Sequence, residues 1–301
     1  MSMISAWMHA FRLRTLPLAM SSTILGSFVA AAEKRFSWKV FILASLTTLL
    51  LQILSNLAND YGDFKKGTDN DDRIGPLRMV QSGQIKPAQM LLAISIVIIL
   101  TLLSGISLIF SGTDGTGNNI KLLFLVLGIG AIFAAVKYTV GKNPYGYKGF
   151  GDIFVFIFFG LVGVLGTYYL HTHNFKADLI LPAASIGFLS AGVLNLNNMR
   201  DYHSDKKALK RTLVVIMGSE KAKFYHLGLI LGALLTVILY TIINFTSPFQ
   251  FLFLVPVPFF VQNAIIVFKN KKPIELNSEL RKLAISTLLF SIAFGIGLMF
   301  H

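Results

Sequence analysis

The chain has 301 residues, of which 54% are hydrophobic and only 14% charged, and its formal net charge is +13. Soluble domains contain about a quarter charged residues, so this composition excludes an ordinary soluble protein. Cysteine is absent, which excludes disulfides and thiolate chemistry.

Apolar runs of about 20 residues, the length needed to cross a bilayer, recur along the chain. We therefore predict an all-α polytopic membrane protein that folds as one domain over residues 1–301. The nine predicted membrane-spanning helices are residues 15–32, 38–58, 88–111, 120–138, 152–170, 179–197, 223–244, 248–268 and 281–300.

The distribution of Lys and Arg predicts the orientation of these helices. If successive loops lie on alternate sides, 22 of the 27 basic residues fall on the side of the N-terminus and five on the other. The positive-inside rule then predicts a cytoplasmic N-terminus and a C-terminus outside. The basic excess therefore indicates membrane topology, and we expect a lipid bilayer as partner and no nucleic acid.

Two connections on the predicted cytoplasmic side, residues 59–87 and 198–222, are rich in acid. Together they hold seven aspartates, half the number of acidic residues (fourteen) in the whole chain. At about 100° per residue, Asn56, Asp60 and Asp63 fall on one helical face, and so do Asn197, Asp201 and Asp205. Like charges three or four residues apart on a helix repel one another, so these two stripes are not explained by local stability.

The composition of the two stripes indicates a cation site. Carboxylate and carboxamide oxygens, with no His or Cys among them, suit a hard cation such as Mg²⁺. Because Mg²⁺ commonly joins carboxylates to phosphate oxygens, the predicted ligand is a phosphate ester or a diphosphate. The alternative is a solvated turn at the membrane interface, where acids simply meet water.

Basic residues beside the stripes fit a phosphate ligand. The first stripe is followed by Lys65, Lys66, Arg73 and Arg78. Arg200 lies within the second stripe, and Lys210 and Arg211 follow it. Many of these charges also have the simpler explanation of the positive-inside rule. Arg200 differs because it lies inside the acidic segment, where its fork of donors matches phosphate geometry.

Two aspartate-rich motifs at the ends of the second and sixth of nine helices resemble those of the UbiA superfamily of intramembrane prenyltransferases. Within it, "NDYGDFKKGTDNDDRIGPLRMVQSG" (residues 59–83) resembles the first motif of the 1,4-dihydroxy-2-naphthoate polyprenyltransferases, and residues 138–169 are similar to a further segment of that subfamily. The start "RLRTLPLA" (12–19) resembles the family's opening of helix one. The basic start and Ala30-Ala31-Ala32 also resemble a cleavable signal peptide. The likeness to the family's first helix favours a helix that is retained.

The resemblance implies Mg²⁺-dependent transfer of a polyprenyl group from polyprenyl diphosphate to 1,4-dihydroxy-2-naphthoate, with loss of CO₂ and diphosphate, giving demethylmenaquinone. It implies a site facing the cytoplasm in the inner membrane of a bacterium. The implied metal ligands are Asn56, Asp60, Asp63, Asp69, Asn197, Asp201 and Asp205. The candidate catalytic residues are Arg200, Lys210, Tyr138 and Lys142, and the candidate substrate-binding residues are Arg14, Arg73, Arg78 and Arg211.

Several of these assignments keep alternatives. Arg14, Tyr138 and Lys142 are candidates for the carboxylate of the acceptor, but each could also be an interfacial side chain of the kind that anchors membrane helices. The acceptor could instead be 4-hydroxybenzoate, homogentisate or haem. An ion-coupled transporter is a rival, although its carboxylates usually lie near the midplane on broken helices.

Overall fold

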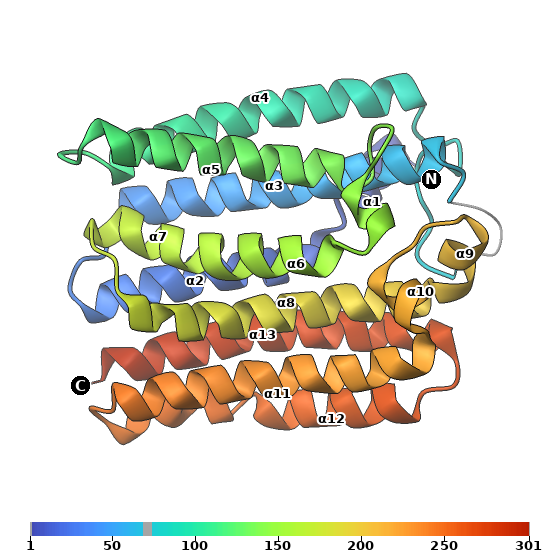
Figure 1. The fold of residues 1–301 in the computed structure, drawn as a ribbon. Helices are drawn as coiled ribbons and strands as arrows, with labels where there is room; N and C mark the ends of the chain where they lie inside the picture. Colours follow the sequence, from blue (N-terminus) through green and yellow to red (C-terminus); the bar gives the residue numbers. More distant parts are fainter. Residues whose placement is uncertain (1, 69–73, 301) are drawn as a thin grey trace.

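The computed structural model describes residues 2–68 and 74–300, and over these residues the chain is helical without any strand. Nine segments of this described part are long and apolar enough to cross a bilayer, which confirms the prediction of nine membrane helices. They run side by side as one bundle (Figure 1). The chain is thus an integral membrane protein.

The observed elements match the predicted spans closely, with shorter helices between them. In chain order they are α1 (Met3–Phe11), η1 (Leu13–Thr15), α2 (Leu16–Ala32), α3 (Trp38–Lys65), α4 (Pro87–Gly112), α5 (Asn118–Lys137), η2 (Tyr145–Lys148), α6 (Gly151–Val155), η3 (Phe156–Val162), α7 (Gly163–Thr172), η4 (Ala177–Leu179), α8 (Ile180–Arg200), α9 (Tyr202–Lys207), α10 (Leu213–Met217), α11 (Ser219–Ile243), η5 (Pro248–Leu254), α12 (Val257–Lys269), η6 (Pro273–Glu275) and α13 (Leu276–Met299).

Two large apolar clusters hold most of the bundle together, and a small third one joins α3, α4 and α7. The larger one joins α2, α7, α8 and α11–α13, and includes the fully buried Phe253, Phe260, Phe290 and Phe294. The second joins α1, α3 and α4 through residues such as Leu54, Leu57 and Met90. By contrast, α5 buries only Ala134 and packs along α3 and α4. The space between the two clusters, next to α5, is therefore where a cavity can form.

Both acidic motifs lie at the same end of the bundle. This end, which carries Asp60, Asp63, Asp201 and Asp205, is called the acidic end below; α9 and α10 gather there, near the N-terminus (Figure 1). Helix α3 continues past the predicted limit of residue 58 to Lys65, so Asp60 and Asp63 are helical, as their spacing requires. Helix α8 stops at Arg200, and α9 resumes after Asp201.

One membrane helix is not a regular α-helix throughout. Between α6 and α7 the seven residues of η3 form a π-helical turn, with the N–H of Gly163 bonded to the carbonyl of Phe158. Here the backbone crosses α8 closely, because a Cβ atom at Gly160 would lie 2.7 Å from the Cα of Gly187. Short π-helical segments inside α-helices are often found at functional sites, and this one borders the cavity described below.

Candidate active site

Asp63 is the centre of a buried polar cluster at the acidic end. Its side chain accepts hydrogen bonds from Arg78 Nη2 at 2.7 Å and from the Tyr147 hydroxyl at 2.8 Å. Asp63 is 2% exposed and Arg78 6% exposed, so this ion pair is shielded from water. A buried carboxylate held by a buried guanidinium is costly to disrupt, because removal of either partner leaves the other charge in a poorly polar environment.

Lys210 brings the two acidic motifs together. Its ammonium lies 3.4 Å from Asp63 Oδ1 and 3.8 Å from Asp205 Oδ1, although 142 residues separate the two aspartates. Burial by itself lowers the pKa of Lys210, but the two carboxylates outweigh it, so the pKa lies above the ordinary value. Lys210 therefore carries a positive charge at the point where both motifs converge.

Tyr147 completes this cluster and was not singled out from the sequence. It donates to Asp63, shares a hydrogen bond of 2.5 Å with the Thr68 hydroxyl, and places its ring 5.2 Å from the Lys210 ammonium. Burial and the charge of Asp63 raise the pKa of Tyr147, which keeps its hydroxyl protonated and donating. From the sequence, its segment is recognised only by its resemblance to the family, because an isolated Tyr in a loop does not indicate a particular chemistry.

The side chain of Asp60 anchors the loop that follows α3. Its two oxygens accept the backbone N–H groups of Met79 at 3.0 Å and Val80 at 3.2 Å. This places Arg78, the residue just before Met79, against Asp63. The spacing argument correctly put Asp60 and Asp63 on one face, but the structure engages Asp60 with the returning loop. Its role as a metal ligand stays a prediction.

An Asp60→Asn variant should therefore lose stability. An amide offers one oxygen where the two N–H groups need two, and its own NH₂ would face one of them. Leaving a buried donor unsatisfied costs about 1–3 kcal/mol. The midpoint of thermal unfolding in detergent should fall, and Lys65→Gln, at an exposed residue of the same helix, serves as the control. An unchanged midpoint for Asp60→Asn would show that these bonds do not anchor the loop.

The side chain of Asn56 is also hydrogen-bonded within the protein. Its NH₂ group donates to the carbonyl of Phe11 at 2.9 Å and to the hydroxyl of Thr15 at 3.0 Å, and its oxygen accepts from Gln52 at 3.3 Å. These bonds tie α3 to the turn between α1 and α2, where Arg12 adopts a left-handed conformation with φ of 51°. Asn56 thus orients the start of α2, and its role as a metal ligand remains a prediction.

The second motif forms a separate cluster around Arg200, which is 2% exposed. Its guanidinium donates to both carboxylate oxygens of Asp201, at 2.8 and 2.5 Å. It also donates to Asn197 at 2.8 Å and to Asn277 of α13 at 3.0 Å. All its nitrogen atoms are thus engaged within the protein. The geometry favours a positioning role for Arg200 over the phosphate contact predicted from sequence.

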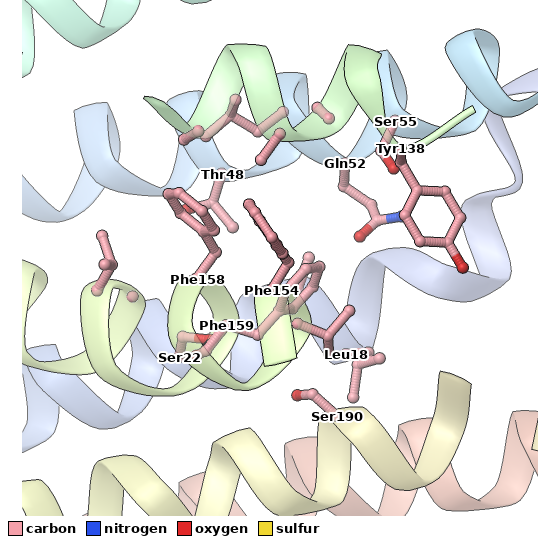
Figure 2. A pocket seen from close by; sticks show the side chains of 18 of the residues that line it. Leu18, Ser22, Thr48, Gln52, Ser55, Tyr138, Phe154, Phe158, Phe159 and Ser190 are labelled. Atoms are coloured by element: carbon pink, nitrogen blue, oxygen red, sulfur yellow. Dashed lines mark hydrogen bonds between the residues drawn. The ribbon is translucent and has the colours of Figure 1, made fainter. Parts of the chain in front are cut away.

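A cavity of about 360 Å³ begins at the Asp63 cluster and continues into the bundle. Its polar lining consists mainly of Arg12, Gln52, Asn56, Asn59, Asp63, Arg78, Asn197 and Lys210, with Tyr138 and Tyr145 beside them. Much of the rest is apolar, including Leu108, Phe124, Phe154, Phe158, Phe159 and Leu170. Figure 2 shows Phe154, Phe158 and Phe159 beside the hydroxyl-bearing side chains of Ser22 and Thr48.

The length of this cavity is comparable to the thickness of a bilayer. Its wall on α3 runs from Ala44 to Asp63, and at a rise of about 1.5 Å per residue that is roughly 28 Å. The hydrocarbon core of a bilayer is about 30 Å thick. The cavity can thus hold a molecule with a charged head at the acidic end and an apolar chain within the membrane.

The remaining predicted residues are dispersed. Tyr138 lines the cavity, whereas Lys142, its predicted partner, is exposed and outside the lining. Arg211 is also exposed, while Arg14 is half-buried within electrostatic reach of Arg78, Arg200 and Asp201. Asp69 and Arg73 lie outside the described residues. The structure therefore brings Asp63, Arg78, Lys210, Asp205 and Tyr138 together and separates Lys142 from them.

Known proteins are similar to this chain in sequence and in fold. The UbiA prenyltransferase family matches residues 19–298. The chain belongs to this family. It is 42% identical to a 1,4-dihydroxy-2-naphthoate octaprenyltransferase of Haemophilus influenzae, covering 98% of this chain and 96% of that one. It is 41% identical to the octaprenyltransferase of the same description from Escherichia coli, covering 99% and 96%.

The UbiA fold extends to more distant structures. A UbiA homolog from Archaeoglobus fulgidus bound to GPP and Mg²⁺ superposes with a TM-score of 0.60 at 17% identity, covering 95% of this chain and 99% of that one. This likeness supports the fold alone. The prenyltransferase family to which the chain belongs accounts for the combination of a charged cluster and a long apolar cavity.

The donor set of this UbiA site suits a hard cation. Asp63 and Asp205 come from the two motifs, are buried, and converge on one positive charge, the Lys210 ammonium. The two carboxylates offer only oxygen atoms as ligands, and oxygen ligands are those that Mg²⁺ prefers. Within residues 2–68 and 74–300, no three His, Cys, Asp or Glu side chains are grouped closely enough to form a metal site by themselves. Oxygens of a bound diphosphate would complete such a set.

Proposed function

We propose that this UbiA prenyltransferase transfers a polyprenyl group from polyprenyl diphosphate to 1,4-dihydroxy-2-naphthoate, with Mg²⁺ as cofactor. Diphosphate and CO₂ leave, and demethylmenaquinol, the reduced form of demethylmenaquinone, is produced. The names of relatives that are 41–42% identical over nearly the whole chain support this acceptor. The observation that carries the proposal is the cavity, which begins at Asp63, Arg78 and Lys210 and continues along an apolar wall for most of the membrane.

The cationic residues at the acidic end act on the leaving group. The bond between the allylic carbon and the diphosphate oxygen breaks, and its electron pair leaves with diphosphate. Arg78 and Lys210, held in place by Asp63, stabilise the negative charge that develops. Mg²⁺, when bound, neutralises further charge on the diphosphate, and Asp63 and Asp205 are the residues best arranged to hold it.

The ring of the acceptor then replaces the diphosphate. The ring carbon that bears the carboxylate attacks the allylic carbon, and the carbon–carbon bond to the carboxylate breaks to release CO₂. Tyr138 lines this part of the cavity, and burial followed by the charges of Asp152 and Asp63 raises the pKa of Tyr138. It therefore remains a hydrogen-bond donor that can orient an acceptor hydroxyl or carboxylate.

The same proposal includes the location of the reaction. The protein is expected in the inner membrane of a bacterium, with its N-terminus and acidic end facing the cytoplasm and residues 1–301 acting as one domain. The excess of Lys and Arg on one side supports this orientation. A cysteine placed at Lys206, an exposed residue at the acidic end, should react with a membrane-impermeant thiol reagent only after the cells are opened.

The decisive experiment is an assay of the purified protein in lipid nanodiscs with polyprenyl diphosphate and single acceptors. With 1,4-dihydroxy-2-naphthoate, the product mass should equal acceptor plus prenyl minus CO₂, and EDTA should abolish its formation. Parallel reactions with 4-hydroxybenzoate and homogentisate test the other acceptors of the superfamily. If 4-hydroxybenzoate were prenylated and the naphthoate were inert, the proposed acceptor would be wrong. Undiminished activity in EDTA would show that the reaction does not need Mg²⁺.

A further inference from the structure

The ammonium of Lys210 lies between the carboxylates of the two acidic motifs. Its Nζ atom is 3.4 and 3.5 Å from the two oxygens of Asp63 and 3.8 Å from Asp205 Oδ1. A cation bound by both carboxylates must lie in this same space, because Mg²⁺ needs its oxygen ligands at about 2.0–2.1 Å. The side chain of Lys210 is buried, so solvent does not separate it from either partner. Lys210 and a metal ion therefore compete for one position.

The backbone directs Lys210 into this position through the turn that ends α9. The N–H of Leu209 donates to the carbonyl of Lys206 at 3.2 Å, and the N–H of Lys210 donates to the carbonyl of Asp205 at 2.9 Å. Leu209 adopts a left-handed conformation with φ of 56°, which is uncommon for residues other than glycine. Its side chain is 83% exposed, so side-chain packing does not explain this conformation. What the turn achieves is to bring Lys210 back beside Asp205 and within reach of Asp63.

The charges of this cluster are already balanced by the protein. One oxygen of Asp63 accepts from the Tyr147 hydroxyl and the other from Arg78, in addition to the contacts with Lys210. Asp63, Asp205, Arg78 and Lys210 together carry two negative and two positive charges. A divalent cation added to these four side chains would bring excess positive charge into a buried cluster and would be repelled by Lys210. The four side chains alone are thus a poor site for Mg²⁺ as long as Lys210 stays between the carboxylates.

A bound diphosphate would change this balance. Lys210 lines the cavity, and its ammonium stands at the end of a flexible four-carbon stem. Phosphate oxygens at the mouth of the cavity would offer this ammonium new negatively charged partners. Both carboxylates would then be open to a cation, and the negative charge of the diphosphate would compensate the charge that the cation adds.

We propose that Lys210 occupies the metal position until the donor binds, and that it yields this position to Mg²⁺ by moving onto the diphosphate. This inference rests on the proposed function. It makes the binding of donor and metal cooperative, so that each raises the affinity of the protein for the other by the same factor. The site then takes up Mg²⁺ together with the diphosphate and holds the ion weakly without it.

The first test measures metal binding without donor. Mn²⁺ suits the same oxygen ligands as Mg²⁺, and its free concentration is followed by EPR while it is titrated into the protein in phosphatidylcholine nanodiscs. In Lys210→Met the affinity for Mn²⁺ should rise roughly tenfold or more over that of the wild type, because a like charge about 4 Å away is removed. Lys206→Met is the matched control. It removes the same charge from an exposed residue at the acidic end, so its affinity should stay close to the wild-type value.

A double variant locates the site that is gained. In Lys210→Met/Asp205→Asn one of the two carboxylates has lost its charge, so the affinity for Mn²⁺ should return to about the wild-type value. Equal affinities in the wild type and Lys210→Met, or the same gain in the double variant, would overturn the proposal.

Thermal unfolding gives a second readout in case Lys210→Met is unstable. Its buried carboxylates have lost a partner that Mn²⁺ can replace, so added Mn²⁺ should raise the unfolding midpoint of this variant and leave that of the wild type nearly unchanged. A Lys210→Met protein that is unstable and gains nothing from Mn²⁺ would count against the proposal.

The last measurement tests the coupling to the donor. An unreactive allylic thiodiphosphate, with sulfur in place of the bridging oxygen, is added to the wild type with and without Mn²⁺. The analogue and Mn²⁺ together should raise the unfolding midpoint by more than the sum of their separate effects, and this excess should shrink in Lys210→Met. A purely additive shift in the wild type would refute the cooperative binding. No acceptor is present, so an incorrectly assigned acceptor would appear only in the product assay and would leave this result unchanged.

Discussion

Replacing Asp63 by Asn should lower the rate of prenyl transfer by two to three orders of magnitude, the loss that follows removal of one preorganised electrostatic group in other enzymes. Asparagine has the same shape but no charge, so it cannot balance the guanidinium of Arg78 and the ammonium of Lys210. Both cations would lose their fixed positions at the mouth of the cavity. The concentration of Mg²⁺ needed for half-maximal activity should also rise.

Glu33→Gln is a matched control for this prediction. Glu33 is likewise bonded to one tyrosine and one lysine, Tyr168 at 2.9 Å and Lys176 at 2.6 Å, but it follows α2 at the end of the bundle opposite the acidic end. Its replacement removes the same kind of charge without touching the cavity, so the rate should stay close to that of the wild type. Initial rates of product formation in nanodiscs measure both variants. A wild-type rate for Asp63→Asn would show that the charge of Asp63 does not contribute to the reaction.

The fold was largely predictable because membrane helices have a strong signal. Nine apolar runs could be counted directly, and their limits agree with the observed helices within a few residues at most ends. One exception is the start of α13, at Leu276, five residues before the predicted limit. The larger one is the end of α3, which continues to Lys65 because buried partners satisfy its polar residues. Hydropathy alone ends a helix where polar residues begin, so it could not detect this extension. The π turn within 156–162 likewise has no signal in an apolar sequence.

The site was predictable in residue type but not in arrangement. Helical spacing correctly grouped Asp60 with Asp63, yet only the returning chain decides that Asp60 accepts the N–H groups of Met79 and Val80. In the same way, a likeness to a family could not reveal that Lys142 is exposed. Tertiary partners more than ten residues away determine these roles, and periodicity within one helix contains no information about them.

The second large effect is expected at Arg200, as a loss of stability. Arg200→Gln removes two bonds to the buried carboxylate of Asp201 and one each to Asn197 and Asn277. Breaking a buried ion pair on one side typically costs about 3–5 kcal/mol, because the remaining charge stays in a medium of low polarity. Denaturant unfolding in mixed micelles should therefore show a large drop in the free energy of unfolding. Arg211→Gln, at an exposed side chain, should change it little.

A double variant separates the ion pair from the other contacts of Arg200. In Arg200→Gln/Asp201→Asn neither charge remains, so much of the lost stability should return, and the difference from additivity measures the coupling of the pair. The rate of prenyl transfer then distinguishes the two roles of Arg200. If it only positions α8 and α13, the folded double variant should bind donor with nearly the wild-type KM. A KM raised tenfold or more in the stable double variant, but not in Asp201→Asn alone, would instead support the direct phosphate contact first predicted for Arg200.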